Sequence, residues 1–308
     1  METIISPVDT KLLLDELTDT KFVRDTNNGR NKIYIFHAED SPSLMREVGR
    51  LREITFRDSG GGTGKACDID DFDMEKGLFD QLIVWNPEDK EIVGGYRLAL
   101  GKNIKVDPDG NVHSPTARLF RFSEKFIGEF LPVSVELGRS FVQPNYQPTL
   151  NLRKGMYSLD NLWDGLGAFI IDNPGVKYLF GKVTMYNHYD SLARDLVLFF
   201  LQKHFPDKDG LLTPRKPLEI KTDRKVLESI FSGHNYEEDS KILVQKIRSL
   251  NEGIPPLINA YMNLSSTMRT FGTALNEHFG GVEETGIMVT FQDIYDSKKD
   301  RHLSTYKR

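Results

Sequence analysis

The middle of this chain consists of short apolar runs with the two-residue period of strands, set between longer runs with the period of a helix. Apolar side chains alternate from Lys32 to His37. The runs Leu82–Trp85 and Glu91–Leu100 are joined by Asn86-Pro87-Glu88-Asp89, whose Asn, Pro and Asp favour a tight turn. The pattern therefore predicts a strand and, further along the chain, a β-hairpin.

Further runs continue this alternation on both sides of the hairpin. A helix is predicted from Ser41 or Ser43 to beyond Phe56, where the glycine-rich run 59–64 ends it. After a helical stretch around 123–127, the pattern predicts strands at Val133–Val142, Tyr178–Met185 and Thr285–Gln292, and helices at Met156–Ile171, from Asp190 or Ser191 to near Phe205, at Ser240–Leu250 and at Leu257–Leu264. This mixture predicts an α/β (α+β) fold with a central mixed sheet flanked by helices.

The same runs divide the 308 residues into four parts. Residues 1–30 form an N-terminal entry segment, and residues 31–205 form the α/β core. Residues 206–296 are expected to form a C-terminal loop and helix extension packed on the core. Within it, Pro206–Asp239 is rich in Pro, Lys and Asp and is predicted to be a loop-heavy crossover or a partly mobile insertion. Residues 297–308 form a polar, basic tail that is predicted to fray.

Composition excludes several classes of function. Lys plus Arg total 40 against 45 for Asp plus Glu, so a net charge of -5 gives no global attraction to nucleic acid or anionic lipid. The one cysteine, Cys67, excludes an intramolecular disulfide framework and a CxxC zinc site. Met1–Thr10 lacks a secretion signal, and the densest apolar run, Leu196–Leu201, is far shorter than the ~20 residues that span a bilayer. We expect a cytoplasmic protein, at most peripheral at the inner face of the membrane.

Two groups of carboxylates are candidates for chemistry. The sequence CDIDDFD supplies four aspartates and VELGRSFV supplies one glutamate, namely Asp68, Asp70, Asp71, Asp73 and Glu136. Such an acidic run is also typical of solvated surface, and it lacks the glycine and distal glutamate of an EF-hand, so no metal is predicted. Glu136 and Arg139 lie three residues apart on a predicted strand, and they point to opposite faces unless a bulge intervenes at Gly138.

Several segments, taken in order, resemble one enzyme family. They are GGYRLAL at Gly94–Leu100, VELGRSFVQPNY at Val135–Tyr146 and KYLFGKVTMYNHYDS at Lys177–Ser191. Together they resemble the ornithine-lipid and glycine-lipid N-acyltransferases of the GNAT superfold, some of which carry a haemolysin-like label. IPPLINAYMNLSS at Ile254–Ser266 and TGIMVTFQDI at Thr285–Ile294 are similar to the closing segments of the same enzymes.

A more distant resemblance links polar positions of the chain to the acyl-homoserine-lactone synthases. The matching positions are Arg52, Phe56, Asp70, Asp73, Arg97, Glu136 and Arg139. The tryptophan that those synthases carry shortly after the phenylalanine is absent, which argues against lactone chemistry. The likeness implies a GNAT-like fold whose twisted sheet splays at Val133–Val142. The pantetheine arm of the donor would lie in that opening, bonded by backbone amides around Phe141 and Val142.

The resemblance also implies a reaction, in which an acyl thioester is attacked by the α-amine of a small amino acid such as glycine or ornithine. Glu136 would accept the amine proton directly or through water, Asp70 and Asp73 would shape the amine pocket, and Arg97 or Arg139 would bind the acceptor's carboxylate. The catalytic candidates are thus Glu136, Arg139 and Arg97. The substrate-binding candidates are Asp70, Asp73, Arg52 and Phe56.

The carrier of the acyl group is a separate question. Typical acetyltransferases follow this strand with a Q/R-x-x-G-x-G/A loop that holds the pyrophosphate of coenzyme A at a helix N-terminus. The segment Gln147–Ser158 keeps Arg153, Lys154 and Gly155 as donor-binding candidates but lacks that spacing. This departure favours an acyl carrier protein over coenzyme A as partner. No bound cofactor is expected, because acyl-ACP or acyl-CoA is a co-substrate.

Three further patterns are interpreted as coincidental. His204 and Asp209 match the H-x-x-x-x-D pattern of glycerolipid acyltransferases, but they lie where a predicted helix runs into a loop. The run GGGTGK lacks P-loop spacing, and Ala66 stands at the hydroxyl position, so the run is interpreted as a mobile flap. Cys67 has no histidine close in the sequence and is not expected to act as a nucleophile.

Two other functions stay open beside fatty-acyl transfer for aminolipid synthesis. One is a CoA-dependent acetyltransferase acting on a non-lipid amine. The other is a catalytically inactive GNAT fold that binds acyl carrier protein. The Glu136/Arg139 and Asp70/Asp73 sets argue against the second, because an inactive fold has no need of them.

Overall fold

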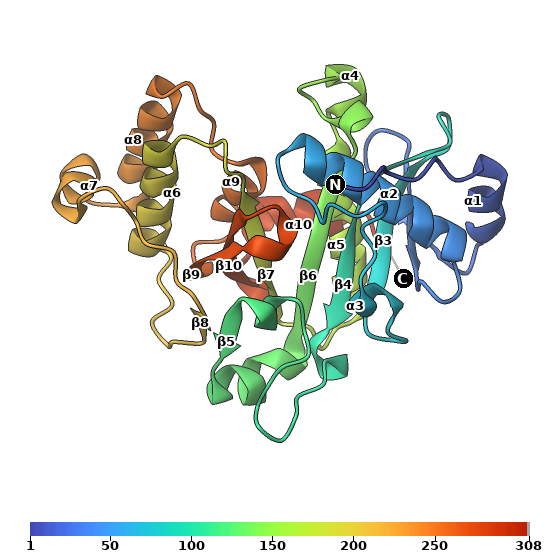
Figure 1. Ribbon diagram of the computed structural model, residues 1–308, viewed down its shortest axis with the longest axis horizontal. Coiled ribbons are helices and arrows are strands. Elements are labelled where there is room, and N and C mark those ends of the chain that lie inside the picture. Colours follow the sequence, from blue (N-terminus) through green and yellow to red (C-terminus); the bar gives the residue numbers. More distant parts are fainter. Residues whose placement is uncertain (307–308) are drawn as a thin grey trace.

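The computed structural model describes residues 1–306. Its centre is an eight-stranded mixed sheet (Figure 1), whose strands follow in space the order β1 (Phe22–Asp25), β2 (Lys32–Phe36), β3 (Asp80–Asn86), β4 (Glu91–Leu100), β6 (Ser134–Val142), β7 (Tyr178–Met185), β10 (Val282–Thr290) and β9 (Arg269–Asn276). A separate two-stranded ribbon pairs β5 (Phe120–Phe122) with β8 (Leu212–Pro214). The predicted α/β class with a central mixed sheet is confirmed.

The sheet opens between β6 and β7. These strands pair in parallel from Ser134 opposite Tyr178 to Leu137 opposite Gly181, and then they diverge. A Cβ atom at Gly181 would lie 2.3 Å from the carbonyl oxygen of Leu137, so only glycine allows this last close approach. Both strands continue past this point without pairing to each other, which is the splay that the resemblance implied.

A β-bulge in β6 decides which side chains share a face. Gly138 pairs with Arg97 and Phe141 with Gly95, so Arg139 and Ser140 together oppose the single residue between those two. Arg139 takes the left-handed conformation that such a bulge needs, with φ of 49°. The bulge lies one residue beyond Gly138, and it turns the Arg139 side chain to the same face of the sheet as Glu136.

Helices cover both faces of the sheet. The front face carries α2 (Pro42–Asp58), α3 (Asp71–Met74) and the β5–β8 ribbon, and the back face carries α5 (Ser158–Asp172), α6 (Ser191–His204), α8 (Tyr236–Ser249) and α9 (Pro256–Met262). The remaining helices are α1 (Thr10–Glu16), α4 (Leu152–Gly155), α7 (Arg224–Ile230) and α10 (Asp296–Leu303). None of the helices in residues 1–306 is both long and apolar enough to cross a membrane.

Helix α2 shows how the pattern of apolar residues fixes this arrangement. Leu44, Val48 and Leu51 recur at helical spacing and are all buried against the front of the sheet. The helix starts after Ser41, with a proline in its first turn, and it ends at the glycine-rich run as predicted. This packing holds the C-terminal part of α2, which carries Arg52, over β3 and β4.

Pro206–Asp239 is loop-heavy, as predicted, with β8, α7 and the first turn of α8 set between its loops. One prediction about the C-terminal part is wrong. The tail does not fray from Ser297, because α10 packs on α5 and Nδ1 of His302 lies 2.8 Å from Oδ1 of Asp164. Strands β1 and β9 were not predicted. With β10, β9 extends the sheet beyond the predicted core, so residues 269–290 are part of the same sheet. Residues 307–308 of the predicted tail lie outside the described residues.

Candidate active site

A buried ion network joins α2, α3 and β4 on the front face. Arg52 donates to Oδ1 of Asp73 at 3.1 Å and to Gln81 at 2.5 Å. Nη1 of Arg97 lies 2.8 Å from Oδ1 of Asp70 and 3.3 Å from Oδ1 of Asp73. Burial alone would raise the pKa of Asp73, but Arg52 and Arg97 hold the pKa of this carboxyl well below its usual value. Each charge in this network therefore has a partner of opposite sign.

Asp70 begins α3 and connects this helix to the network. Its side chain accepts from the amide of Asp73, and the Asp73 side chain accepts from the amide of Asp70, which is a capping box. Oδ1 of Asp70 also binds Arg97, whose guanidinium lies 4.9 Å from the ring centre of Phe79. Arg52 and Arg97 are almost fully buried, so the structure gives them structural partners rather than access to a free substrate.

Arg139 forms a second part of the network, next to the bulge. Its Nε lies 2.8 Å from Oδ2 of Asp68, and its guanidinium lies over the ring of Phe279 at 4.4 Å. Burial raises the pKa of Asp68 in spite of the Arg139 charge. Phe56 packs edge-on against Phe279, at 5.0 Å between ring centres. Phe56 is buried, so it packs against the ring on which Arg139 lies and does not face a cavity.

The glycine-rich run after α2 is anchored and is not a free flap. The amides of Thr63 and Gly64 and the hydroxyl of Thr63 donate to the carboxylate of Glu53, which also binds Arg57. Burial opposes ionisation of Glu53, but the hydrogen bonds from Thr63 and Arg57 lower its pKa. The interpretation as a mobile flap is wrong, because the run wraps around an anion supplied by the protein itself.

Glu136 lies apart from this network, on the same face of β6. Its Oε1 accepts from the amide of Thr116 at 3.0 Å and from the Thr116 hydroxyl at 2.6 Å. The residue is 2% exposed, and its Oε2 has no hydrogen-bond partner among residues 1–306. A buried carboxylate oxygen without a donor is costly, which makes this atom a candidate for contact with a substrate.

A second charged pair lies beside Glu136, across the opening of the sheet. Nζ of Lys182 on β7 lies 3.0 Å from Oε2 of Glu284 on β10 and donates to the carbonyl of Pro115 at 3.3 Å. Pro115 precedes the threonine that holds Glu136, so the loop at residues 115–116 contacts both charged groups. Asn276 also donates to Oε2 of Glu284, at 3.1 Å. Glu136, Lys182 and Glu284 thus form a row on the front face, one on each of three neighbouring strands.

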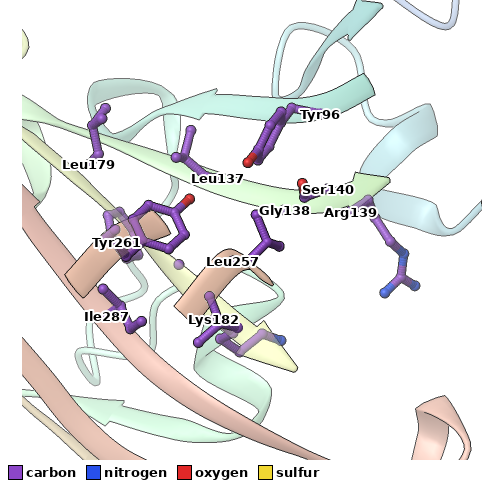
Figure 2. A pocket seen from close by; sticks show the side chains of 13 residues that line it. Tyr96, Leu137, Gly138, Arg139, Ser140, Leu179, Lys182, Leu257, Tyr261 and Ile287 are labelled. Carbon is purple, nitrogen blue, oxygen red and sulfur yellow. The ribbon is translucent and has the colours of Figure 1, made fainter. Parts of the chain in front are cut away.

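The opening between β6 and β7 holds a cavity, shown in Figure 2. Its volume of about 30 Å³ has room for one or two water molecules. Leu257 and Tyr261 of α9 cover it from the back, while Gly138 and Lys182 lie at its front edge. Arg139 extends away from it in Figure 2. Burial raises the pKa values of Tyr96 and Tyr261, whose hydroxyl groups lie together at the cavity, so both phenols are neutral at physiological pH.

The predicted donor-binding residues are divided between the strand and the loop that follows it. Phe141 and Val142 pair with β4, and Phe141 is buried in the core. Gly155 is also buried, and a Cβ there would lie 2.4 Å from the amide nitrogen of Pro148. Lys154 forms a 2.7 Å ion pair with Asp89, whereas Arg153 is exposed on α4. Of these two exposed basic residues, Arg153 is therefore the one without an ion pair among residues 1–306.

Two patterns that were interpreted as coincidental prove to be so. His204 contacts Asp239 at 2.8 Å, and Asp209 instead pairs with Lys125 and Arg269. Burial raises the pKa of Cys67 to about 11, so its thiol is protonated at neutral pH. Neither feature supplies a catalytic group.

The sequence analysis missed Thr116, Lys182 and Glu284. Thr116 lies in a loop whose sequence carries no signal for its contact with Glu136, twenty residues along the chain. Lys182 alternates with apolar residues on its strand. The sequence therefore shows that it faces one side of the sheet, but it does not show which residue it contacts there. Its partner on β10 could be found only from the strand order.

Comparison with known proteins identifies the class of protein to which this chain belongs. A family profile described as "Acetyltransferase (GNAT) domain" matches residues 51–154, which include the C-terminal part of α2, the ion network, β6 and Glu136. The splayed mixed sheet and the charged front face are thus those of a GNAT-type acyltransferase.

Two curated relatives cover nearly the whole chain. A glycine N(alpha)-acyltransferase of Phocaeicola vulgatus is 53% identical over 99% of this chain and 94% of the relative. One of Bacteroides thetaiotaomicron is 51% identical over 99% of this chain and 91% of the relative. The chain belongs to the family of these glycine N(alpha)-acyltransferases, and it is an N-acyltransferase that acts on an amino acid.

Solved structures show more distant likenesses. A CoA-dependent acyl-homoserine lactone synthase with SAM and isopentyl-CoA is 13% identical, with a TM-score of 0.40, over 88% of this chain and 89% of that one. An aminoglycoside 6'-N-acetyltransferase complexed with coenzyme A is 11% identical, with a TM-score of 0.34, over 84% of this chain and 96% of that one.

Proposed function

We propose that this enzyme transfers a fatty 3-hydroxyacyl group from the thioester of an acyl carrier protein to the α-amine of glycine, giving an N-acylglycine for aminolipid synthesis. The observation that carries the proposal is the unpartnered Oε2 of Glu136, buried on the front face beside the opening of the sheet. The two relatives that are named glycine N(alpha)-acyltransferases support glycine as acceptor.

In the proposed reaction, the front face supplies the acceptor and the opening of the sheet supplies the donor. The ammonium group of glycine gives one proton to Glu136, directly or through a water molecule, and becomes a nucleophilic amine. Its nitrogen then attacks the thioester carbonyl carbon, forming the C–N bond. As the tetrahedral intermediate collapses, the C–S bond breaks, and the leaving thiolate takes the second proton lost from nitrogen. Thr116 holds the Glu136 carboxylate in place throughout.

The donor's pantetheine arm requires the cavity to enlarge. A volume of about 30 Å³ is far smaller than such an arm. Leu257 and Tyr261 close the back of the cavity, and the helix that carries them is short and starts at two consecutive prolines. We therefore place the arm between β6 and β7, with α9 displaced from the position that it has in this conformation.

The carrier is proposed to dock at the projecting loop and helix α4 (Figure 1), beyond the end of β6. Arg153 is exposed there, and an acyl carrier protein presents an acidic surface. The same projection also exposes Leu150, Leu152 and Met156, with relative exposures of 71%, 68% and 54%. We assign these three apolar side chains to a peripheral contact with the membrane that receives the lipid product.

The proposal is tested by mass spectrometry of lipids from a host that expresses the enzyme. New N-acylglycine species are expected, and they should be lost with Glu136→Gln. The purified enzyme, supplied with 3-hydroxyacyl carrier protein and isotopically labelled glycine, should form the same product. Consumption of acetyl-coenzyme A with a non-lipid amine, without N-acylglycine, would replace the proposed function by that of an ordinary acetyltransferase.

A further inference from the structure

Lys182 and Glu284 are the charged residues of the front face that the proposed reaction leaves without a role. Their side chains are 14% and 7% exposed, so this ion pair is removed from bulk water. A buried pair of this kind contributes little to stability on its own, because desolvating the two charges offsets their attraction. Its place at the front edge of the cavity, next to Glu136, calls for another explanation.

We infer that Lys182 is the site for the carboxylate of the amino-acid acceptor. Lys182 and Glu136 then act together as a clamp for a zwitterion, with the acceptor's ammonium at Glu136 and its carboxylate at Lys182. The inference rests on the proposed function and deepens it, because it names the chemistry by which an α-amino acid is told apart from a simple amine.

The strand register supports this geometry. Glu136 lies opposite Phe180 on β7, and Lys182 is two residues further along that strand, on the same face of the sheet. The paired part of the two strands ends at Leu137 opposite Gly181, so Glu136 and Lys182 lie on neighbouring strands at the point where the sheet opens.

The hydrogen bonds of Lys182 and Glu136 also support this inference. Both charged groups contact the loop at residues 115–116, Lys182 through the carbonyl of Pro115 and Glu136 through Thr116. Glu136 keeps one buried oxygen without a donor. Lys182 is a flexible donor of three hydrogen bonds, so it can exchange the oxygen of Glu284 for that of a ligand.

Arg139, predicted from the sequence as an alternative carboxylate ligand, is less well placed. Its Nε lies 2.8 Å from Oδ2 of Asp68, its guanidinium lies over the ring of Phe279, and its side chain extends away from the cavity in Figure 2. Arg97 is more deeply buried and contacts two aspartates. The structure therefore assigns the acceptor's carboxylate to a lysine that neither the sequence motifs nor the resemblance singled out.

The test compares two acceptors, glycine and glycinamide, which lacks the carboxylate, at a fixed saturating concentration of acyl donor. Lys182→Met should raise KM for glycine about 10- to 100-fold, the range expected for losing a hydrogen bond to a charged group, while kcat changes much less. KM for glycinamide should stay within about twofold of the wild-type value. Lys76→Met, at a side chain that is 85% exposed, is the matched control and should change neither.

A second variant separates substrate binding from a merely structural role. Lys182→Met/Glu284→Gln removes the Glu284 carboxylate that the single variant leaves without its cation, so it should regain any stability that the single variant loses, yet it should keep the raised KM for glycine. Recovery of the wild-type KM in the double variant would overturn the inference. An equal loss with glycine and glycinamide in the single variant would overturn it as well.

The wild-type reaction tests the proposed function by itself. If the wild-type enzyme forms no N-acylglycine, the function fails and the inference falls with it. If the wild-type enzyme acylates glycine and Lys182→Met leaves KM for glycine unchanged, only the assignment of Lys182 is overturned.

Discussion

Two sets of charged residues lie on the same face of one sheet, and they differ in how completely their charges are matched. Around α3, Asp70 and Asp73 each contact arginine and also cap the helix. Around the opening of the sheet, Glu136 forms no ion pair among residues 1–306 and keeps a buried oxygen with no donor. Paired charges hold elements together, whereas a buried carboxylate without a cation is prepared for a ligand, so residue type alone does not identify the active site.

This difference changes one argument made from the sequence. The aspartate cluster was taken as evidence against an inactive fold, because such a fold would not need it. The structure gives Asp70 and Asp73 a structural role in attaching α3 to β4, so they say nothing about activity. The evidence for catalysis rests on Glu136 and on the family relationship.

The largest effect is expected at Glu136, the buried carboxylate without an ion pair. Glu136→Gln keeps an oxygen that can accept from Thr116 but removes the base, so kcat should fall about 10²- to 10⁴-fold while the melting temperature stays close to that of the wild type. Release of free thiol in the presence of glycine measures the turnover. A variant that keeps more than half of the wild-type kcat would remove Glu136 from the mechanism.

The ion-paired set around α3 should respond in the opposite way. Asp73→Asn leaves Arg52 and Arg97 buried with less opposing charge, so the free energy of unfolding should fall by about 3–5 kcal/mol. Turnover per folded molecule should change only a few-fold. Urea denaturation measures the loss, with the exposed neighbour Asp71→Asn as control, for which a change below about 0.5 kcal/mol is expected. Equal losses in the two variants would show that the network has no special role.

The pH dependence of stability sharpens the same comparison. Asp73 and Glu53 have lowered pKa values in the folded protein, so their stabilisation is present above the unfolded-state values near 4 and is lost as the pH falls through the folded-state values. The wild-type free energy of unfolding should therefore drop between about pH 5 and 2, and Asp73→Asn should show a shallower drop. Parallel curves for the two proteins would contradict the low pKa of Asp73.

Sequence patterns predicted much of the fold but only part of the site. Strands β2, β4, β6 and β7 and helices α2 and α6 follow from local periodicity, and they lie close to the predicted ranges. The ion pair between Lys182 and Glu284 depends on a strand order that brings residues about a hundred positions apart together. The partner of Glu136 could not be predicted either, since the loop that carries Thr116 has no periodic pattern.

A smaller effect is expected at the proposed docking loop. Arg153→Glu should raise KM for a carrier-protein donor about three- to tenfold, in keeping with one exposed charge, and should leave KM for the matching acyl-coenzyme A unchanged. Arg248→Glu, an exposed site on α8, serves as control. Equal KM values for the carrier-protein donor in wild type and Arg153→Glu would argue against docking at this loop.

The smallest effect is expected for the membrane contact. Leu150→Ser/Leu152→Ser removes two exposed leucines at little cost to the fold, so binding to vesicles of bacterial lipids should weaken a few-fold. Sedimentation with vesicles measures the bound fraction, and turnover with a water-soluble short-chain donor should not change. Unaltered vesicle binding would place any membrane contact elsewhere on the protein.

The separate roles of the two charged sets are tested most directly by a double-variant cycle of Glu136→Gln and Asp73→Asn, with turnover and the free energy of unfolding measured on the same samples. If one set performs the chemistry and the other holds the fold, the changes add within about 0.5 kcal/mol in both quantities. Nearly all of the loss in turnover then comes from Glu136→Gln, and nearly all of the loss in stability comes from Asp73→Asn. A coupling energy above about 1 kcal/mol would show that the two sets act as one site and would contradict this account.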